Sequence, residues 1–584
     1  MSLFPLVLML SKAKSILFPH AIGFRTKCAQ EGLFVDPFFA YTSGRWLCNN
    51  DAQLKARYAA FNIDGLKDIA SETIGSPVQS MTKIAESLNR IFLLTHQNGT
   101  QTIARIPTPI CGPPFFTTSS EVATMDLLRR LGVPVPKVLA WSSRAHATRV
   151  ESEFIIMEKV DGEPLSEMGW NKIDHEDFAI KLANMVRPLV NLNFNCYGSL
   201  YYKHDLEGVQ RNRILDDFIV DAPKGVDVSP FCIGPIARRD FWEDERASIL
   251  DMTGPWTSPL EYLADVASRE QIWIDKFAKP HLLDDFLCGL PLQGKQDDHI
   301  EMLEYYKYLL PFILPQEPQY LHGHLWHPDL HSGNLFVVKE SMNDDGKVHV
   351  NITSCIDWQG AFIGPAFLQL TAPTMYQSEG APLDALVLPP HLDTLDDANK
   401  KEVLLLNDEA LRKQQFESLA FGDLMIDDAH IPTLVQRQEL DDLAHCTWRT
   451  GLLPFRDALV KFCQRFSEIA PGKKCPIAFT ADQLSAHAAA HAYWSMHRAR
   501  AEDMEKEFGL DEYGYVAGDD ISRFMSIQKK VEKRMREWVA EGKTEHGKLV
   551  KTYLWPYRET LDDHPRTHLV LESEVPSTTS TNPS

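Results

Sequence analysis

The sequence predicts an α+β fold in two unequal lobes: a small lobe with an antiparallel sheet and one helix, and a larger lobe that is mainly helical. Apolar runs at 81–87, 90–96 and 101–107 have the length and composition of strands, and the turn pair Asn98-Gly99 separates the last two. Over residues 175–194, apolar side chains recur every three or four positions, which is typical of a helix. Strands therefore come first along the chain and helices follow.

Turn and cap signals delimit the elements of the small lobe. Asn98 and Gly99 both tolerate the positive φ that a type I′ turn demands, so we expect a tight hairpin at this pair. Residues 118–132 form a predicted helix that one of its first three residues, Thr-Ser-Ser, can cap and that stops at its final glycine. The segments 133–141 and 153–165 are predicted to be extended, and a Gly and Pro break ends the second one.

Composition limits the possible partners. The 584 residues are 44% hydrophobic and 24% charged, an ordinary composition for a globular protein with two or more cores. The formal net charge of −21 argues against nucleic-acid binding, which needs a concentrated basic face, and slightly favours a cationic small substrate. The 10 cysteines include no CxxC pair and no zinc-like spacing, so we expect reduced thiols in a non-secretory compartment.

The two ends of the chain differ from its centre. No acidic residue precedes Glu31, while Lys12, Lys14, Arg25 and Lys27 are basic, which predicts a mitochondrial transit peptide over 1–32. A disordered cytosolic leader or a weak signal peptide are the alternatives, and no later segment resembles a transmembrane span. The polar C-terminal end, SEVPSTTSTNPS, is predicted to be disordered. The expected boundaries are 33–160 for the N-terminal extension and small lobe, 161–560 for the helical lobe and 561–584 for the tail.

The stretch WHPDLHSGNLFV, residues 326–337, places Asp329 and Asn334 five residues apart, just before an apolar run. Phosphoryl transfer from ATP requires oxygen ligands for Mg²⁺ and a separate carboxylate that accepts the proton of the acceptor hydroxyl. Asp329 can supply that base and Asn334 an amide oxygen for the metal, while Asp357, which follows another apolar strand, can complete the metal site. His327 is expected to connect this loop to the region of Asp357 rather than to react.

A predicted hairpin brings the two proposed metal ligands together. Residues 334–338 and 351–356 form its two strands, so Asn334 and Asp357 should lie at the same end. The alternative is that Asp329 and Asn334 merely satisfy backbone groups of a turn, as such side chains often do.

The block HPDLHSGN followed by IDWQ resembles the aminoglycoside phosphotransferase family. The segments YTSGRWLCNND, SMTKIAESLNRIF, IARIP and IGPIARRDFWEDERA are similar to a fungal mitochondrial group within it, the altered inheritance of mitochondria protein 9 type. The resemblance covers most of the chain from about Leu33 to about residue 560. It implies a protein-kinase-like bilobal fold and an ATP- and Mg²⁺-dependent kinase for a hydroxyl acceptor whose identity stays open.

The resemblance also implies roles for residues of the small lobe. Arg105 stands where these kinases carry the phosphate-contacting lysine, and Glu121 stands where the ion-pair partner of that lysine belongs. Backbone groups near Glu158 and Val160 would meet the adenine edge. The turn at 86–89 takes the place of the phosphate-covering loop, although it lacks the glycines of the protein-kinase pattern.

Several alternatives remain open at this level. Arg105 and Glu121 could form a plain surface ion pair. A pseudokinase that binds or scaffolds without turnover would explain the missing glycines and the arginine. A choline- or ethanolamine-kinase-like enzyme would share the chemistry and differ only in its acceptor. Four residues could line an acceptor site or simply pack between the lobes: Arg238, Arg239, Trp242 and Trp256.

Overall fold

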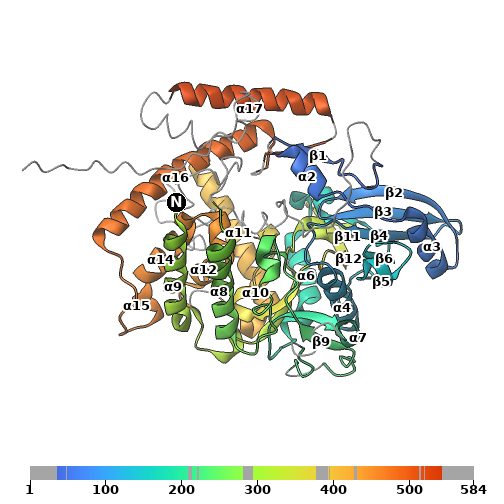
Figure 1. Ribbon diagram of the computed structural model, residues 1–584, viewed down its shortest axis with the longest axis horizontal. Helices are drawn as coiled ribbons and strands as arrows, with labels where there is room; N and C mark the ends of the chain where they lie inside the picture. Colours follow the sequence, from blue (N-terminus) through green and yellow to red (C-terminus); the bar gives the residue numbers. More distant parts are fainter. Residues whose placement is uncertain are drawn as a thin grey trace, which may run out of the picture.

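The computed structural model describes residues 36–541, except 48, 208–213, 220–222, 280–293, 377–387, 389–391, 393–394, 427–429, 512–513 and 519. The predicted transit peptide at 1–32 and the predicted tail at 561–584 lie outside the described residues. The described part has two lobes, with the sheet of the small lobe on one side and a group of helices on the other (Figure 1). The predicted α+β bilobal architecture is confirmed.

The small lobe is built on a five-stranded antiparallel sheet with the order β2-β3-β4-β6-β5. Alternate residues of one strand enter two different cores: Ile155 and Met157 pack with the interior of the large lobe, whereas Phe154 and Ile156 pack on the opposite face. This alternation follows from the two-residue period of a strand. The strands are β2 (Val78–Glu86), β3 (Asn89–His96), β4 (Gln101–Pro107), β5 (Val138–Ser142) and β6 (Phe154–Glu158).

The hairpin between β3 and β4 is present, but its turn differs from the type I′ turn that we expected. The amide of Gly99 donates to the carbonyl of His96 and the amide of His96 donates to Thr100, which leaves three residues in the loop. Gly99 has φ +85°, while Asn98 is absent from the positive-φ residues of the described chain. A single left-handed glycine after a tight turn is the three-residue hairpin solution.

Helices cover both faces of this sheet. The predicted helix at 118–132 is α4 (Phe116–Arg130), and Gly132, with φ +81°, follows its end as expected. The predicted cap is wrong, because the helix begins before Thr118 and its N-cap, Phe115, makes no side-chain cap. The hydroxyl of Ser119 instead donates to Asp205 at 2.7 Å inside the protein. The opposite face is covered by α3 (Ile63–Ile74), which the sequence analysis did not predict.

The large lobe surrounds one extensive apolar core. The predicted helix at 175–194 is α6 (His175–Val190), capped by Asp174, whose carboxylate accepts from the amide of Asp177 at 3.0 Å. The longer helices are α8 (Pro259–Phe277), α9 (Gln296–Ile313), α11 (Asp397–Phe421), α12 (Leu434–Ala444), α14 (Leu452–Gln464) and α16 (Ala481–Phe508). The shorter elements are β7 (Glu163–Pro164), β8 (Ser199–Tyr202), β9 (Phe231–Gly234), β10 (Gly323–Trp326), β13 (Phe362–Pro365), α5 (Leu165–Met168), α7 (Lys203–Leu206), α10 (Ala366–Gln369), α13 (Thr447–Thr450) and α15 (Phe466–Ile469).

The two ends of the described chain meet beside the small lobe. Strand β1 (Gly44–Trp46) pairs with β14 (Tyr515–Ala517) in an antiparallel ladder, followed on one side by α2 (Asn50–Ala56) and on the other by α17 (Ile521–Glu541). Figure 1 shows α17 lying across α16 at the edge of the molecule. No helix among the described residues is long and apolar enough to cross a membrane.

Candidate active site

The hairpin of β11 (Leu335–Met342) and β12 (Val348–Cys355) positions the two predicted metal ligands. Leu335 pairs with Cys355, and the amide of Ile356 donates to the carbonyl of Asn334 at 2.9 Å. Asn334 and Asp357 therefore leave the same end of the hairpin, as the sequence predicted. Both strands run further than expected, so that the turn lies at 343–347.

His327 connects the loop before β11 to the residue that precedes Asp357. Its Nε2 bonds the carbonyl of Ile356 at 2.8 Å, and its Nδ1 accepts from the amide of Asp329 at 3.1 Å. Because the first partner is an acceptor and the second a donor, the ring is the neutral tautomer with its proton on Nε2. Burial lowers the pKa of His327, which is 4% exposed. The expected connecting role of His327 is confirmed.

This neutral histidine predicts a dependence of stability on pH. The unfolded chain binds a proton at His327 near pH 6.5, whereas the folded chain binds it only at lower pH. The contribution of the neutral ring to the stability of the fold is therefore complete above pH 6.5 and decreases below it. Below pH 6.5, each further unit of decrease in pH should lower the free energy of unfolding of the wild type. The decrease should exceed that of His327→Gln by up to about 1.4 kcal/mol per pH unit. Urea denaturation of both proteins from pH 7.5 to 5 measures the difference, and parallel curves would contradict it.

The loop leaves the carboxylate of Asp329 free. The amide nitrogen of Asn334 donates to the backbone carbonyl of Asp329 at 2.9 Å, and the Asn334 side-chain oxygen accepts no hydrogen bond from the described residues. The Asp329 side chain is 53% exposed and accepts no hydrogen bond from the described residues, and Nε2 of His331 lies 3.7 Å from its carboxylate. Asn334 thus partly fits the turn-stabilising alternative, whereas the Asp329 carboxylate does not.

Asp357 has an unusual backbone conformation. Its φ is +64°, a region that non-glycine residues rarely occupy and that is enriched at functional sites. The side chain is 49% exposed, and one carboxylate oxygen lies 3.5 Å from Nη2 of Arg105. An aspartate from the large lobe and an arginine from the small lobe therefore meet at this point.

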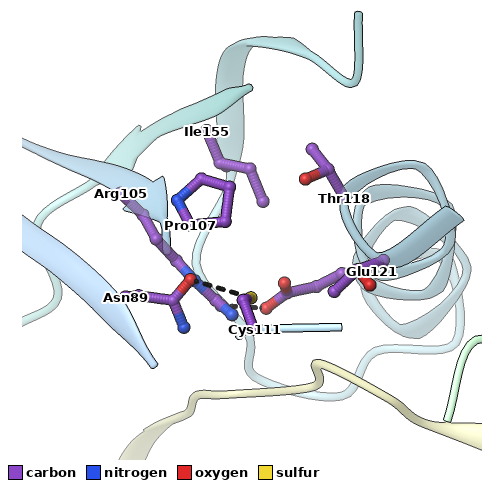
Figure 2. Close-up of a pocket in the computed structure, with 8 residues that line it drawn as sticks. Asn89, Arg105, Pro107, Cys111, Thr118, Glu121 and Ile155 are labelled. Carbon is purple, nitrogen blue, oxygen red and sulfur yellow. Dashed lines mark hydrogen bonds and ion pairs between the residues drawn. The ribbon is translucent and has the colours of Figure 1, made fainter. Parts of the chain in front are cut away.

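Arg105, on β4, and Glu121, on α4, point toward each other inside a small pocket of the small lobe (Figure 2). Nη1 of Arg105 donates to the Glu121 carboxylate, and the two residues are 6% and 2% exposed. The surface ion-pair alternative is therefore wrong. Burial raises the pKa of Glu121 to about 7, and Arg105 opposes that rise. The pKa of Arg105 lies above its usual value, because Glu121 and Asp357 together outweigh its burial.

We expect Glu121→Gln to lower the free energy of unfolding by about 3 kcal/mol, because the mutation leaves a buried guanidinium without its carboxylate. Glu72→Gln is the matched control, since the exposed pair of Glu72 and Arg149 should contribute less than about 1 kcal/mol. Urea denaturation of the two variants compares these losses. Equal losses would show that the buried pair contributes no more than a surface pair.

Sequence reasoning assigned no role to Gln359, which connects Arg105 to the rest of the site. Its side-chain oxygen accepts from Arg105 Nη2 and from Asn89 Nδ2, the latter at 2.8 Å. Its amide nitrogen donates to the carbonyl of Cys111 at 2.6 Å. The available signal was the position of Gln359 two residues after Asp357 in IDWQ. This one side chain fixes the Arg105 guanidinium relative to the loop of Asp357.

The segment after β6 links the lobes. The Glu158 carboxylate accepts from Nη1 of Arg129 at 3.1 Å and from the amide of Lys137 at 2.8 Å, so this side chain is held against the small lobe. Among the described residues none hydrogen-bonds the backbone of Val160.

The residues considered for an acceptor site are engaged in packing. Arg238 bonds Asp240 and lies with its guanidinium carbon 4.7 Å from the ring centroid of Phe362. The indole N–H of Trp242 donates to the carbonyl of Ile236 at 2.6 Å, while its ring stacks on Phe116 of α4. The geometry of Arg238 and Trp242 therefore favours the alternative that these residues pack between the lobes.

The sequence of this chain is similar to that of a known protein family over the region that contains the site. Residues 81–371 match the phosphotransferase enzyme family, a range that includes the sheet, Arg105, Glu121 and the loop from His327 to Gln359. The chain contains a phosphotransferase-family domain. The matched range also ends close after the Asp357 loop, so the contacts described above lie within the domain.

Among curated proteins, a subtelomeric hrmA-associated cluster protein of Aspergillus fumigatus is 28% identical over 523 residues, which cover 83% of this chain and 97% of the relative. The mitochondrial altered inheritance of mitochondria protein 9 of Candida albicans is 29% identical over 39% of this chain and 44% of its own length. Among solved structures, a putative aminoglycoside phosphotransferase from Ralstonia eutropha is 13% identical, with a TM-score of 0.36 over 71% of this chain and all of that one.

Proposed function

We propose that the phosphotransferase-family domain transfers the γ-phosphoryl group of ATP to a hydroxyl of a small-molecule acceptor, with Mg²⁺ as the metal. The observation that carries the proposal is the convergence of Asp329, Asn334 and Asp357 on one end of the β11–β12 hairpin, where Nη2 of Arg105 lies 3.5 Å from the Asp357 carboxylate. Carboxylate and amide oxygens are the ligands that Mg²⁺ prefers, and two protein ligands leave its other positions to phosphate oxygens and water.

The side chains of Asn334 and Asp357 both offer oxygen atoms to Mg²⁺. Because Asn334 uses its amide nitrogen on the Asp329 carbonyl, the side-chain atom left for a metal is the oxygen. Asp357 offers a half-exposed carboxylate from the neighbouring strand end. A bound Mg²⁺ would neutralise phosphate charge during transfer, and these two side chains would hold it.

The remaining residues have complementary roles. Arg105, held by Glu121 and Gln359, would contact the phosphates with a planar fork of donors in place of the usual lysine. The backbone of Val160 would bind the adenine edge, and the Glu158 side chain would hold that segment against the small lobe. Asp329, with a free carboxylate and a backbone fixed by His327, would accept the proton of the acceptor hydroxyl.

The test is ADP formation by the full chain with ATP, Mg²⁺ and a panel of hydroxyl acceptors that includes aminoglycosides, macrolides, fructosamines, choline and ethanolamine. Acceptor-stimulated, Mg²⁺-dependent ADP formation that Asp329→Asn loses supports the proposal. Failure of a folded chain to bind Mg²⁺ and ATP would reject the nucleotide site itself.

A pseudokinase is the second candidate, and one observation favours it. Arg105 reaches both Gln359 and, at 3.5 Å, the Asp357 carboxylate, so the arginine competes with a cation for that ligand. Nucleotide binding with no turnover for any acceptor would favour this candidate. For the location of the protein we propose mitochondria, because of the basic N-terminal composition and because the altered inheritance of mitochondria protein 9 relatives are named as mitochondrial proteins.

A further inference from the structure

A second group of basic side chains lies on the other face of the small-lobe sheet, beneath the N-terminal extension, residues 36–62. Arg57 of the extension and Arg90 of β3 are 2% and 0% exposed. The guanidinium carbon of Arg57 is 4.3 Å from the ring centroid of Trp46, and that of Arg90 is 5.7 Å from the ring centroid of Tyr41. Arg90 also donates to the carbonyl of Arg57, so the two arginines are direct neighbours.

Four donors in this group make no hydrogen bond within the described part of the chain, although one of them, Nε of Arg90, lies 3.6 Å from the Glu86 carboxylate. Nη2 of Arg57, Nε and Nη1 of Arg90, and the indole nitrogen of Trp46 are buried and make no hydrogen bond with any described residue. The donors that are satisfied bond the extension itself, such as Nη1 of Arg57 to the carbonyl of Gln53 at 3.1 Å. A buried donor left unpaired costs about 1–3 kcal/mol, and more when the group is charged.

The charge of the group is also unbalanced. Among the described residues, the acidic partner of the two guanidinium groups is Glu86, 3.6 Å from Nε of Arg90, and Arg57 forms no ion pair. Glu86 is shared further, because it accepts from Lys83 at 2.8 Å and from the hydroxyls of Thr42 and Ser43. Burial lowers the pKa of Arg57 to about 10, as expected for a cation that lacks an anionic neighbour.

We propose that this group binds the phosphate moiety of a small ligand, between the N-terminal extension and β3. Guanidinium and indole N–H groups are donors only, so their ligand must supply acceptors, and two arginines select an anion with several oxygens. A phosphate group would accept from Nη2 of Arg57, Nη1 of Arg90 and the indole N–H of Trp46, and it would supply the missing negative charge. It would also hold the extension against the β2–β3 turn, since Glu86 ends β2 beside that turn.

This site is separate from the proposed nucleotide site. Successive residues of a strand point to opposite faces of a sheet. Asn89 bonds Gln359 on the face of Arg105 and Asp357, whereas its neighbour Arg90 bonds the extension on the opposite face. A ligand on Arg57 and Arg90 therefore does not contact the residues that would hold Mg²⁺ and ATP.

The experiment is thermal unfolding of the full chain in increasing inorganic phosphate, with NaCl holding the ionic strength constant. We expect a saturable, phosphate-specific rise in Tm, which Arg57→Met and Arg90→Met should each abolish or shift to at least tenfold higher phosphate. Arg149→Met, which removes an exposed arginine paired with Glu72, should keep the response. Asp357→Ala should also keep it while losing the Mg²⁺-dependent response to ATP, which separates this proposal from the proposed function.

Glycerol 3-phosphate in a parallel titration distinguishes the source of the phosphate. A response to both compounds assigns the site to phosphate monoesters, and a response to inorganic phosphate alone assigns it to the free anion. No phosphate-specific rise in the unaltered chain would overturn the proposal, as would an unchanged rise in both arginine variants. If the methionine variants do not fold, Trp46→Phe, which removes one free donor and keeps an aromatic ring, should weaken the response.

Discussion

Replacing Asp357 by alanine should abolish the Mg²⁺-dependent binding of ATP. Asp357 is the charged one of the two proposed metal ligands at the end of the β11–β12 hairpin, because the other, Asn334, carries no charge. Even changes around a metal's ligands typically cost about 10–100-fold in metal affinity, so we expect loss of the carboxylate to cost at least about 100-fold. Isothermal titration calorimetry of ATP, with and without Mg²⁺, measures the effect.

The mutation also removes the carboxylate that lies 3.5 Å from Arg105. Metal-free ATP should therefore bind Asp357→Ala no more weakly than it binds the wild type, because Arg105 becomes free for the phosphates. Asp344→Ala is the matched control, since Asp344 is exposed at the opposite, turn end of the same hairpin. An Asp357→Ala protein that binds Mg²⁺ and ATP like this control would show that the metal is held elsewhere.

Replacing Asp329 by asparagine should lower the rate of phosphoryl transfer about 10²–10⁴-fold and change ATP affinity little. The asparagine has nearly the same shape but cannot accept the proton of the acceptor hydroxyl. The backbone contacts of Asp329 with His327 and Asn334 involve its amide and carbonyl, which the mutation keeps. The measurement is kcat and KM for ADP release with an acceptor identified from the panel, together with calorimetry of ATP.

His331→Asn is the appropriate control for this loop. His331 accepts from the amide of Gly333 through Nδ1 at 2.9 Å and lies 3.7 Å from the Asp329 carboxylate, so its loss perturbs the surroundings of that carboxylate but leaves the carboxylate itself in place. We expect a smaller loss of kcat than for Asp329→Asn. If Asp329→Asn retained full turnover, another group would have to accept the proton.

The N-terminal extension gives the small lobe features that its sheet alone does not have. Its strand β1 pairs with β14, so segments from the two ends of the described chain form one small sheet. Its residues Thr42 and Ser43 bond Glu86, at the end of β2. The turn between β2 and β3 is therefore anchored from outside the sheet. This anchoring suits a turn that lacks the flexibility glycines provide.

The hairpin at β3 and β4 shows where local prediction succeeds and where it stops. The pair Asn98-Gly99 located the turn correctly, because few residues accept positive φ. The choice between a two-residue and a three-residue loop depended on which strand residues pair, and that register is fixed by packing on both faces of the sheet. The cap of α4 failed for a related reason, since Ser119 bonds Asp205 in a distant part of the chain.

The sequence by itself determined the order of elements from β2 through α4 to β6, and the spacing of Asp329, Asn334 and Asp357 around one hairpin. These features depend on periods of two and 3.6 residues and on turn chemistry, all of which act between near neighbours. Only the tertiary structure decided that Arg105 and Glu121 are buried, and that Gln359, 254 residues from Arg105, accepts from its guanidinium. Such contacts depend on how the lobes and the extension pack against each other, and no local pattern along the chain encodes that arrangement.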